Sequence, residues 1–447
     1  MASDGVLILS HCGFSFAEDL AAAIRARNLQ PFVLSSRPLP EHGDARLQAL
    51  RNIAAPVLSS DSHVLAVEDV ERAIASLQEA GHTVRACISV WEGYRALMAY
   101  ANARLGVGDL PVWQVDLLRN KGGVRNALHR AGLSRVRARI VTPEVLDTLQ
   151  RDGGAYFIKP AQGIASYGAF RLTHETSWAA LDTIAAQARA DTVYASALGD
   201  DVTFIAEDYL PGTEFSFEVL VSHGRPYVVG LHEKCQLTEA HGTVLEDSCT
   251  SPPASLSGRD VTAGLDWLSA TFTHLGLDWG CFHVEARFDG ARWDLIEINP
   301  RVGGSLISHS VKELNGEASL LDLWLDLLLE QSGGIQHDVL TSRLARLAYA
   351  ADGTPPTRAA TFFRVYFATP GEIESIEVQP GRRAPVIQQV LLKPGDAVPD
   401  ASREVFLGQL LWRLSRDERD ATLADLLTES ATAIDVRYRT SSTVLEA

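Results

Sequence analysis

Residues 1–112 alternate between two patterns of hydrophobic and polar positions. Short apolar runs rich in β-branched residues predict strands at 6–10, 31–35, 55–58 and 84–90. Longer stretches with apolar residues at helical spacing predict helices at 16–27, 67–80 and 92–105. Strands that alternate with helices pair in parallel and are joined by right-handed crossovers. The pattern therefore predicts an N-terminal α/β domain, built on a parallel sheet, over residues 1–112.

The pattern between residues 113 and 335 mixes strands and helices less regularly. Strands are predicted at 155–160 and 204–208, with a helix at 177–190 between them. Two further apolar runs, 281–288 and 294–299, flank Asp289 and Gly290, a pair typical of tight turns, and so predict a β-hairpin. A strongly apolar helix follows at 318–331, and the glycine-containing segment 332–336 predicts a domain boundary.

The remaining residues, 336–447, carry no cluster of side chains with recognisable catalytic chemistry. Their pattern predicts strands at 362–368 and 374–378 and a helix at 402–414. Neither internal repeats nor low-complexity tracts interrupt the chain. We therefore expect a small C-terminal α+β domain that acts as a lid or packs against the rest of the protein.

The predicted hairpin carries oxygen-bearing side chains on one face. Glu297 and Asn299 lie two residues apart on its second strand, so an extended backbone directs both toward the same side. Glu285 lies on the first strand, which the turn brings alongside the second. Mg²⁺ binds few protein carboxylates and completes its shell with water and substrate phosphates. These three side chains form a candidate magnesium site, and the alternative is an ordinary hairpin with exposed acidic residues.

Residues that suit anionic ligands surround this candidate metal site along the chain. Arg301 follows the hairpin directly and supplies a fixed cation, while Gly303 and Gly304 let a ligand approach the backbone closely. Lysine is rare, because it accounts for only five of the 40 basic residues, so each lysine is a stronger candidate for a specific role. The five are Lys121, Lys159, Lys234, Lys312 and Lys393.

One of these lysines, Lys159, stands in a segment that suits phosphate oxygens. Lys121 lies in the first turn of a predicted helix, and Lys159 ends the strand at 155–160. The small residues Gly163, Ser166 and Gly168 follow, and they allow backbone N–H groups to approach phosphate oxygens. The loop is not a Walker A motif, because the required Gly-Lys-Ser/Thr is absent.

Taken in order, these motifs resemble the ATP-grasp superfamily of carboxylate–amine ligases, which activate a carboxylate as an acyl phosphate. The resemblance covers about residues 114–330 and rests on the lysine segments and on Glu297-Ile-Asn299-Pro-Arg301 followed by two glycines. The last part of this motif, Asn299-Pro-Arg301 followed by two glycines, is most similar to L-amino-acid ligases, the dipeptide synthases of the bacilysin-synthetase type. The resemblance implies an ATP-grasp fold of mixed α/β and α+β character, with a Rossmann-like domain at 1–112. An ATP-grasp domain at 113–335, with a lid at about 120–205, and a C-terminal α+β domain at 336–447 would follow.

The resemblance also assigns residues to the nucleotide. It implies that the segment 207–210 holds adenine, with Glu207 accepting a hydrogen bond from the exocyclic amine, and that Glu214 binds the ribose hydroxyls. Glu218 stays open between a site residue and a solvated strand residue. The residues implied for ATP are Lys121, Lys159, Gly163, Ser166, Gly168, Glu207, Asp208, Tyr209, Leu210 and Glu214.

The same resemblance implies which residues contact the substrates. Lys234 and Glu246 lie where dipeptide-forming members place a lysine and a glutamate near phosphate and substrate. Arg301 would contact the substrate carboxylate and the tetrahedral oxyanion, helped by backbone N–H groups near Gly303 and Gly304. Ser305 is small where related ligases can carry a bulky residue, so we expect a donor larger than alanine. His309 could line the donor pocket, and His232 and His241 are substrate candidates that can equally be solvated histidines.

The composition limits the partners of the protein. A hydrophobic fraction of 46% and a formal charge of -16 describe a well-buried chain with an acidic surface, which disfavours a nucleic-acid partner. The five cysteines are dispersed, and their spacing indicates neither a disulfide framework nor a zinc site. No signal peptide or membrane span is expected, because acidic residues interrupt the most apolar helix and no basic region precedes the N-terminal apolar run. We expect a cytoplasmic protein with small-molecule substrates, and a homodimer is compatible with this expectation.

The expected reaction joins a carboxylate, such as an amino acid, to an amine and converts ATP to ADP and phosphate. The expected cofactors are ATP and two Mg²⁺ ions, for which Mn²⁺ could substitute. Two alternatives stay open: a carboxylase of the biotin-carboxylase type that forms carboxyphosphate, and a nucleotide-binding protein without catalysis. A NAD-dependent dehydrogenase is disfavoured because the N-terminal domain lacks the Gly-x-Gly-x-x-Gly fingerprint.

Overall fold

The structure is a computed structural model of the 447-residue chain. It describes residues 3–12, 16–39, 43–164, 166–193, 195–198, 201–240, 243–399 and 405–439. For residues 44, 238–240 and 243–245 it describes the backbone alone. His241, a substrate candidate from the sequence, lies outside the described residues.

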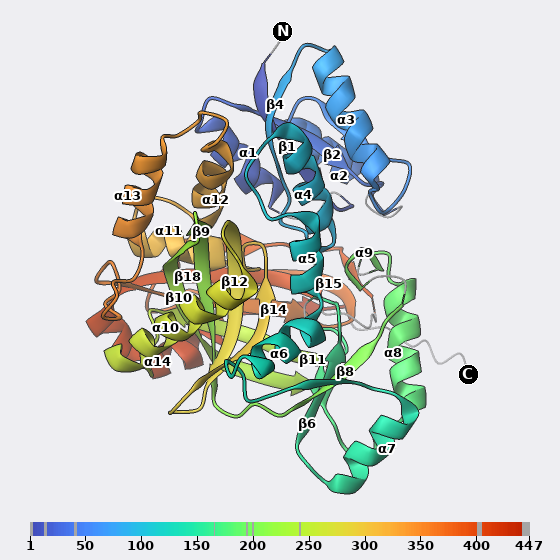
Figure 1. Cartoon of the computed structure of the whole chain (residues 1–447), viewed down its shortest axis with the longest axis vertical. Helices are drawn as coiled ribbons and strands as arrows, with labels where there is room; N and C mark the ends of the chain where they lie inside the picture. Colours follow the sequence, from blue (N-terminus) through green and yellow to red (C-terminus); the bar gives the residue numbers. More distant parts are fainter. Residues whose placement is uncertain are drawn as a thin grey trace.

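The N-terminal region forms the parallel sheet that its sequence predicts. Four strands are hydrogen-bonded in the order β3-β2-β1-β4, and all of these pairings are parallel, which confirms the α/β pattern. The domain occupies the top of Figure 1. Its strands are β1 (Asp4–Ser10), β2 (Gln30–Ser35), β3 (Val57–Ser59) and β4 (Thr83–Ile88). Its helices are α1 (Ala17–Arg25), α2 (Gly43–Ile53), α3 (Val67–Glu79), η1 (Glu92–Tyr94) and α4 (Arg95–Leu105), of which α2 was not predicted.

A second, smaller sheet lies at the lower right of Figure 1, beside two helices of its own. Its strands are paired antiparallel in the order β5-β8-β6-β7. These strands are β5 (Ala138–Ile140), β6 (Tyr156–Pro160), β7 (Phe170–Arg171) and β8 (Phe204–Asp208). The helices of this part of the chain are α5 (Val112–Arg119), α6 (Lys121–Arg130), α7 (Pro143–Asp152), α8 (Trp178–Ala190) and α9 (Ala195–Leu198).

The central sheet has eight strands in the order β13-β12-β9-β10-β11-β14-β18-β16. Residues 361–364 pair with residues 248–251, so this sheet continues across the boundary expected near residue 335. The small C-terminal sheet β17-β15-β19 and helix α14 pack beside it. The central strands are β9 (Thr213–Ser222), β10 (Arg225–Ala240), β11 (Thr243–Ser251), β12 (Gly280–Phe288), β13 (Trp293–Asn299), β14 (Ala359–Ala368), β16 (Ile387–Val390) and β18 (Val405–Ser415). The small-sheet strands are β15 (Gly371–Val378), β17 (Ala397–Val398) and β19 (Ile434–Tyr438), and α14 is Arg416–Ser430.

The helix predicted at 402–414 is wrong, because residues 405–415 form strand β18. A continuous apolar run does not by itself distinguish a buried strand from a buried helix. Here β18 lies between β14 and β16, and both of its edges are hydrogen-bonded. Six consecutive residues, 407–412, are therefore buried, which explains why their sequence lacks the polar alternation of a surface strand.

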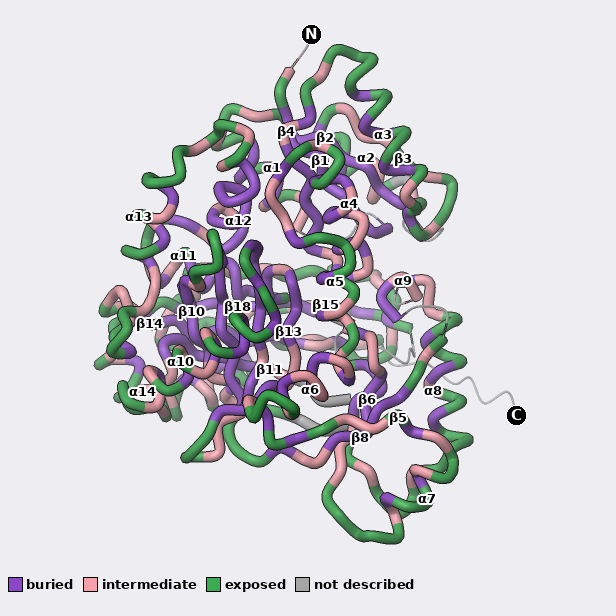
Figure 2. The backbone as a smooth tube through the Cα atoms, in the orientation of Figure 1, coloured by how far each residue is buried: buried purple, intermediate pink, exposed green. Residues whose placement is uncertain are grey.

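Alternating residues give strand β9 two chemically different faces. Phe215 and Phe217 are fully buried in a cluster that includes Leu268 and Phe272 of α10 (Gly258–Leu275). The intervening residues Glu214, Ser216 and Glu218 lie on the opposite face, as strand geometry requires. The tube in Figure 2 shows these central strands as largely buried. The same strand therefore supplies core residues and polar residues for a site.

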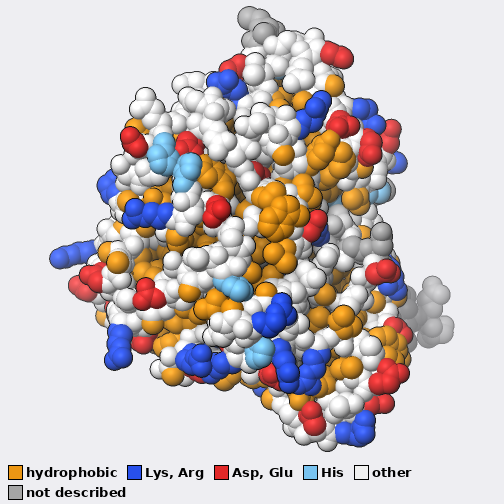
Figure 3. Space-filling model, viewed as in Figure 1, with side chains coloured by type: hydrophobic (Ala, Val, Ile, Leu, Met, Phe, Trp, Pro, Cys, Tyr) orange, Lys and Arg blue, Asp and Glu red, His pale blue; other side chains and the backbone are white. Residues whose placement is uncertain are grey.

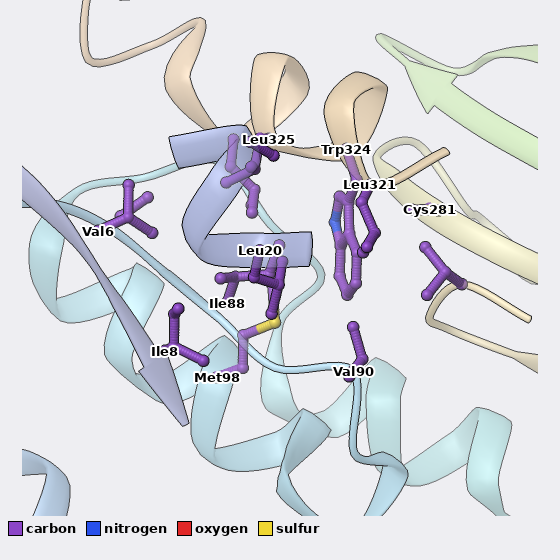
Figure 4. Close-up of a cluster of buried hydrophobic side chains, with 14 of the residues drawn as sticks. Val6, Ile8, Leu20, Ile88, Val90, Met98, Cys281, Leu321, Trp324 and Leu325 are labelled. Carbon is purple, nitrogen blue, oxygen red and sulfur yellow. The ribbon is translucent and has the colours of Figure 1, made fainter. Parts of the chain in front are cut away.

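Helix α12 (Leu320–Leu329) connects the N-terminal domain to the central sheet, and all of its residues except Asp322 are buried. Figure 4 shows Trp324 of this helix near Val90, beyond β4, and near Cys281 of β12. The neighbouring helices are α11 (Ile307–Asn315) and α13 (His337–Leu347). One apolar cluster thus fixes the N-terminal domain against the sheet. Among the described residues, none of the helices combines the length and apolar character that crossing a bilayer requires.

Candidate active site

A cavity opens between the small antiparallel sheet and the polar face of the central sheet. It encloses about 810 Å³, the open solvent at its mouth included. Gly168 does not line this cavity, and it adopts a left-handed φ of 68° with its backbone against Pro160 and Ile184. The nucleotide-site candidates that do line it are Lys121, Lys159, Gly163, Ser166, Glu207, Asp208, Tyr209, Leu210 and Glu214.

Apolar side chains that the sequence did not identify form part of the same cavity wall. They come from β6, from the loop between β6 and β7, and from β13. Such walls, combined with a few charged groups, suit a ligand with a flat apolar part and an ionised part. The alternation of β6 places Phe157 and Lys159 on one face and could have identified the first of them. The apolar lining residues are Phe157, Ile164, Tyr167, Ala169 and Ile296.

The candidate metal residues meet at one end of the cavity. Glu285 on β12 is the register partner of Glu297 on β13, and both line the cavity. Asn299 donates from Nδ2 to Glu297 Oε1 over 2.8 Å. Lys121 Nζ lies 3.1 Å from Glu297 Oε2. Two carboxylates and a carboxamide therefore lie side by side on the hairpin, and their oxygen atoms are of the hard kind that Mg²⁺ prefers.

Lys234 links several acidic residues beside this end of the cavity. Its Nζ lies 2.8 Å from Glu214, 2.7 Å from Glu246 and 2.7 Å from Glu285. Burial alone would lower the pKa of Lys234, but the three carboxylates outweigh burial and raise this pKa well above its ordinary value. The lysine is therefore a permanent cation, and it brings Glu246 next to the candidate metal residues.

A buried ion cluster orders Lys159 in the cavity. Lys159 Nζ lies 2.9 Å from Glu207 Oε2, and Arg125 Nε lies 3.1 Å from Glu207 Oε1. Burial raises the pKa of Glu207, but Arg125 and Lys159 outweigh it and hold this pKa at about 2. Arg125 also reaches Asp294 at 3.1 Å, which ties α6 to β13. Glu207 thus positions a lysine as well as lining the cavity.

A second group of buried charged residues contacts Glu285. His283 Nδ1 is 2.9 Å from Glu218, and His283 Nε2 is 3.3 Å from Glu285. Burial lowers the pKa of His283, but the two carboxylates raise it to about 10, so this ring carries a positive charge at neutral pH. Glu218 is fully buried, so it is not a solvated strand residue. His232 is also fully buried, bonds Ser310 at 2.8 Å and does not line the cavity.

Arg301 and the residues after it lie where the central sheet meets the N-terminal domain. Arg301 Nη2 is 2.8 Å from Glu92 of η1. A Cβ on Gly303 would come within 2.7 Å of His283, so only glycine fits there, whereas a Cβ on Gly304 would meet no atom within 4 Å. Ser305 has a left-handed φ of 53°. Gly304 therefore faces open space, next to a residue in an uncommon backbone conformation.

His309 lies apart from the cavity that the nucleotide-site candidates line, which we call the nucleotide cavity. Its Nε2 is 3.4 Å from Asp19, and both residues line a second cavity between α1, α11 and α12. Ser308, its neighbour, accepts a hydrogen bond from the backbone N–H of Leu321 and so supports the start of α12. The structure therefore does not bring these residues to the nucleotide cavity with the other candidates.

Arg287 is a cavity residue that the sequence analysis missed. It donates to Glu214 over 3.1 Å and to the carbonyl of Leu210 over 2.7 Å. Its guanidinium also approaches the ring of Tyr209, 5.4 Å from the ring centroid. Arg287 lies two residues after Glu285 on β12, so strand alternation was the signal that could have identified it.

Comparisons with known proteins match part of the chain to a domain family and to a curated relative. Residues 155–309 match the ATP-grasp domain family. Over 280 residues the chain is 28% identical to carnosine synthase 1 of Gallus gallus, and this match covers 57% of the chain. The chain spans only 28% of the length of that relative.

Three solved structures extend the comparison to nearly the whole chain. An L-amino acid ligase from Bacillus licheniformis superposes with a TM-score of 0.72 at 16% identity, covering 98% of this chain and 99% of the ligase. A biotin carboxylase from Campylobacter jejuni gives 0.67 at 13% identity, covering 98% and 92%. A phosphoribosylglycinamide synthetase from Anaerococcus prevotii gives 0.63 at 13% identity, covering 98% and 100%. Together with the domain match over residues 155–309, these likenesses confirm the predicted ATP-grasp fold.

Proposed function

We propose that this protein, which has an ATP-grasp fold, is an ATP-dependent ligase that joins a carboxylate to an amine and releases ADP and phosphate. One observation carries the proposal: two lysines and two facing carboxylates line the same cavity. The lysines are Lys121 and Lys159, and the carboxylates belong to Glu285 and Glu297. Phosphoryl transfer needs this combination, because its catalysis rests on positioning and on charge stabilisation around the phosphates.

Mg²⁺ fits the acidic end of the cavity. Glu285, Glu297 and Asn299 would hold it, because Glu285 and Glu297 face each other across the hairpin, Asn299 contacts Glu297, and the two glutamate side chains are 17% and 19% exposed. Lys234 and Lys121 already balance these carboxylates with positive charge. When bound, Mg²⁺ would supply additional positive charge to the β- and γ-phosphates.

The proposed reaction has two steps. A carboxylate oxygen of the donor attacks the γ-phosphorus of ATP, and ADP leaves with the electron pair of the broken P–O bond. The acceptor amine then attacks the acyl carbon, and phosphate leaves with the former carboxylate oxygen. The amine proton passes to a carboxylate of the site or to the departing phosphate. Lys121 and Lys159 hold the triphosphate, and Arg301 holds the donor carboxylate and the tetrahedral oxyanion.

Amino acids are the proposed substrates. The fold likeness to an L-amino acid ligase over nearly the full length of both chains supports this choice, and so does the sequence similarity to a protein named carnosine synthase. A carboxyphosphate-forming carboxylase is the second candidate, because a biotin carboxylase shares the fold at a TM-score of 0.67. A crossed panel of amino acids, followed by phosphate release and mass spectrometry, tests the first proposal. Phosphate release that needs bicarbonate and no amino acid pair would favour the second.

The donor pocket gives a prediction about substrate size. Gly304 faces open space beside Ser305, so a Ser305→Trp side chain should occupy room that a large donor needs. We expect this variant to disfavour large donors relative to alanine by about 10-fold or more, since such overlap costs roughly 1–3 kcal/mol. The measurement is kcat/KM for a large and a small donor with one acceptor. Ser305→Ala is the matched control, because it shares the left-handed backbone without the bulk, and equal donor preference in both variants would contradict the prediction.

A further inference from the structure

We propose that His223, Glu330 and His337 form a binding site for a divalent transition-metal ion, separate from the nucleotide cavity. The three side chains offer two imidazole nitrogens and one carboxylate oxygen, and these atoms all lie within 4.8 Å of one another. They come from three different segments: the turn between β9 and β10, the end of α12 and the start of α13. The face shown in Figure 3 carries two adjacent histidine side chains beside acidic ones near these elements.

Two of the three distances between these groups are close to those of a metal site, and the third is at most 4.8 Å. His337 Nδ1 is 2.6 Å from Glu330 Oε1, and His223 Nε2 is 3.6 Å from the same oxygen. In a tetrahedral site with bonds of about 2.0–2.1 Å to nitrogen and oxygen, ligand atoms stand roughly 3.3 Å apart. Only small side-chain rotations therefore separate the observed arrangement from one with a shared cation.

Glu330 provides the strongest sign of a missing partner. Its side chain is only 7% exposed, and its Oε2 is buried without a hydrogen-bond partner among the described residues. A buried carboxylate oxygen that lacks a partner is costly, because it has lost water without gaining a donor. A cation bound between the two histidines would satisfy the carboxylate. The histidine side chains are 57% and 49% exposed, which leaves the site open to ions from solvent.

The position of His223 is unusual for the turn that it occupies. His223 and Gly224 have φ values of 49° and 74° in the two-residue connection between β9 and β10. Asparagine before glycine is the preferred pair for such a turn, although histidine also adopts left-handed φ values more often than most residues. The ring of Trp279 contacts the His223 ring edge-on, with centroids 4.9 Å apart, and so limits the rotation of the imidazole.

The ligand set favours Zn²⁺ among the common cations. Two imidazoles and one carboxylate leave a fourth tetrahedral position for water, whereas Mg²⁺ and Ca²⁺ prefer oxygen ligands alone. The nucleotide cavity offers the opposite selectivity, because its candidate ligands are two carboxylates and a carboxamide. Bound metal would connect the β9–β10 turn to the connection between α12 and α13, and it should therefore raise the melting temperature as its concentration rises.

The test is a Co²⁺ titration of the whole chain in excess Mg²⁺, followed by visible absorption, with Zn²⁺ competition. We expect one Co²⁺ per chain with the intense bands of a four-coordinate site, displaced by Zn²⁺. His223→Asn should weaken binding by at least the ~10–100-fold typical of losing an outer-shell partner, since a direct ligand is removed. Asparagine suits the turn, so this variant should fold. His337→Ala and Glu330→Gln should weaken binding similarly.

The controls separate this site from other surface histidines and from the nucleotide cavity. His174 and His274 are exposed histidines outside the cluster, and their alanine variants should bind Co²⁺ like the parent chain. Glu285→Gln should also leave the Co²⁺ bands unchanged. The proposal is wrong if the parent chain shows no four-coordinate bands, if His223→Asn and His337→Ala keep them at full affinity, or if Glu285→Gln alone removes them.

Discussion

Replacing Glu297 by glutamine should slow turnover by about 100-fold or more while leaving the fold intact, because the change removes a charge where phosphoryl transfer is stabilised. Glu297 faces Glu285 across the hairpin and contacts Lys121 at 3.1 Å. Glutamine keeps the size of the side chain and an oxygen for Asn299, so the packing of β13 should survive. The measurement is kcat at saturating ATP and Mg²⁺, together with the melting temperature.

The matched control for this variant is Glu374→Gln, which makes the same change at an exposed position of β15. We expect its kcat and melting temperature to equal those of the parent chain within error. Near-normal kcat for Glu297→Gln at saturating Mg²⁺ would remove Glu297 from the phosphoryl-transfer site. A loss of activity that follows a fall in melting temperature would assign it a structural role instead.

An Arg301→Met variant should lose about 100- to 1,000-fold in kcat/KM for amide formation, the scale of removing one oxyanion-stabilising donor. Nucleotide affinity should change little, because Arg301 is not among the residues that line the nucleotide cavity. Its partner Glu92 lies 2.8 Å away with a side chain only 6% exposed, so the single change leaves a buried carboxylate unpaired. The measurements are kcat/KM for the coupled reaction and the dissociation constant of ADP.

Two further proteins make the result for Arg301 interpretable. The double variant Glu92→Gln/Arg301→Met removes the unpaired charge, and it should recover stability without recovering activity. Arg292→Met removes an exposed arginine of the neighbouring hairpin and should behave like the parent chain. Recovery of amide formation in the double variant would mean that Arg301 acts only by neutralising Glu92.

The sequence predicted the parts of the site that depend on local pattern. Strand alternation placed Glu297 and Asn299 on one face, and the Asp289-Gly290 turn placed Glu285 beside them, as the register of β12 and β13 now shows. The parallel N-terminal sheet followed from alternating strands and helices in the same way. These predictions succeeded because period and turn chemistry are set by neighbouring residues.

The features that the sequence did not predict depend on contacts between distant segments of the chain. Lys234 and Glu246 were candidates, but their pairing with Glu285 requires the register of three strands, which no local pattern specifies. His283 lies within the predicted strand 281–288, but its bond to Glu218 appears only when β9 and β12 pair. The error at residues 402–414 has the same origin, because two flanking strands rather than the sequence period determine that β18 is a strand.

The most direct test of the proposed ligase is to follow an oxygen label from the donor. An amino acid labelled with ¹⁸O in its carboxylate is incubated with ATP, Mg²⁺ and an acceptor that gives product in the crossed panel. An acyl-phosphate mechanism predicts one ¹⁸O in the inorganic phosphate for each amide formed, with ADP as the nucleotide product. Label in AMP would contradict phosphoryl transfer from the γ-position. Phosphate that gains no label from the amino acid, but gains it when ¹⁸O-labelled bicarbonate is supplied instead, would show a carboxylase.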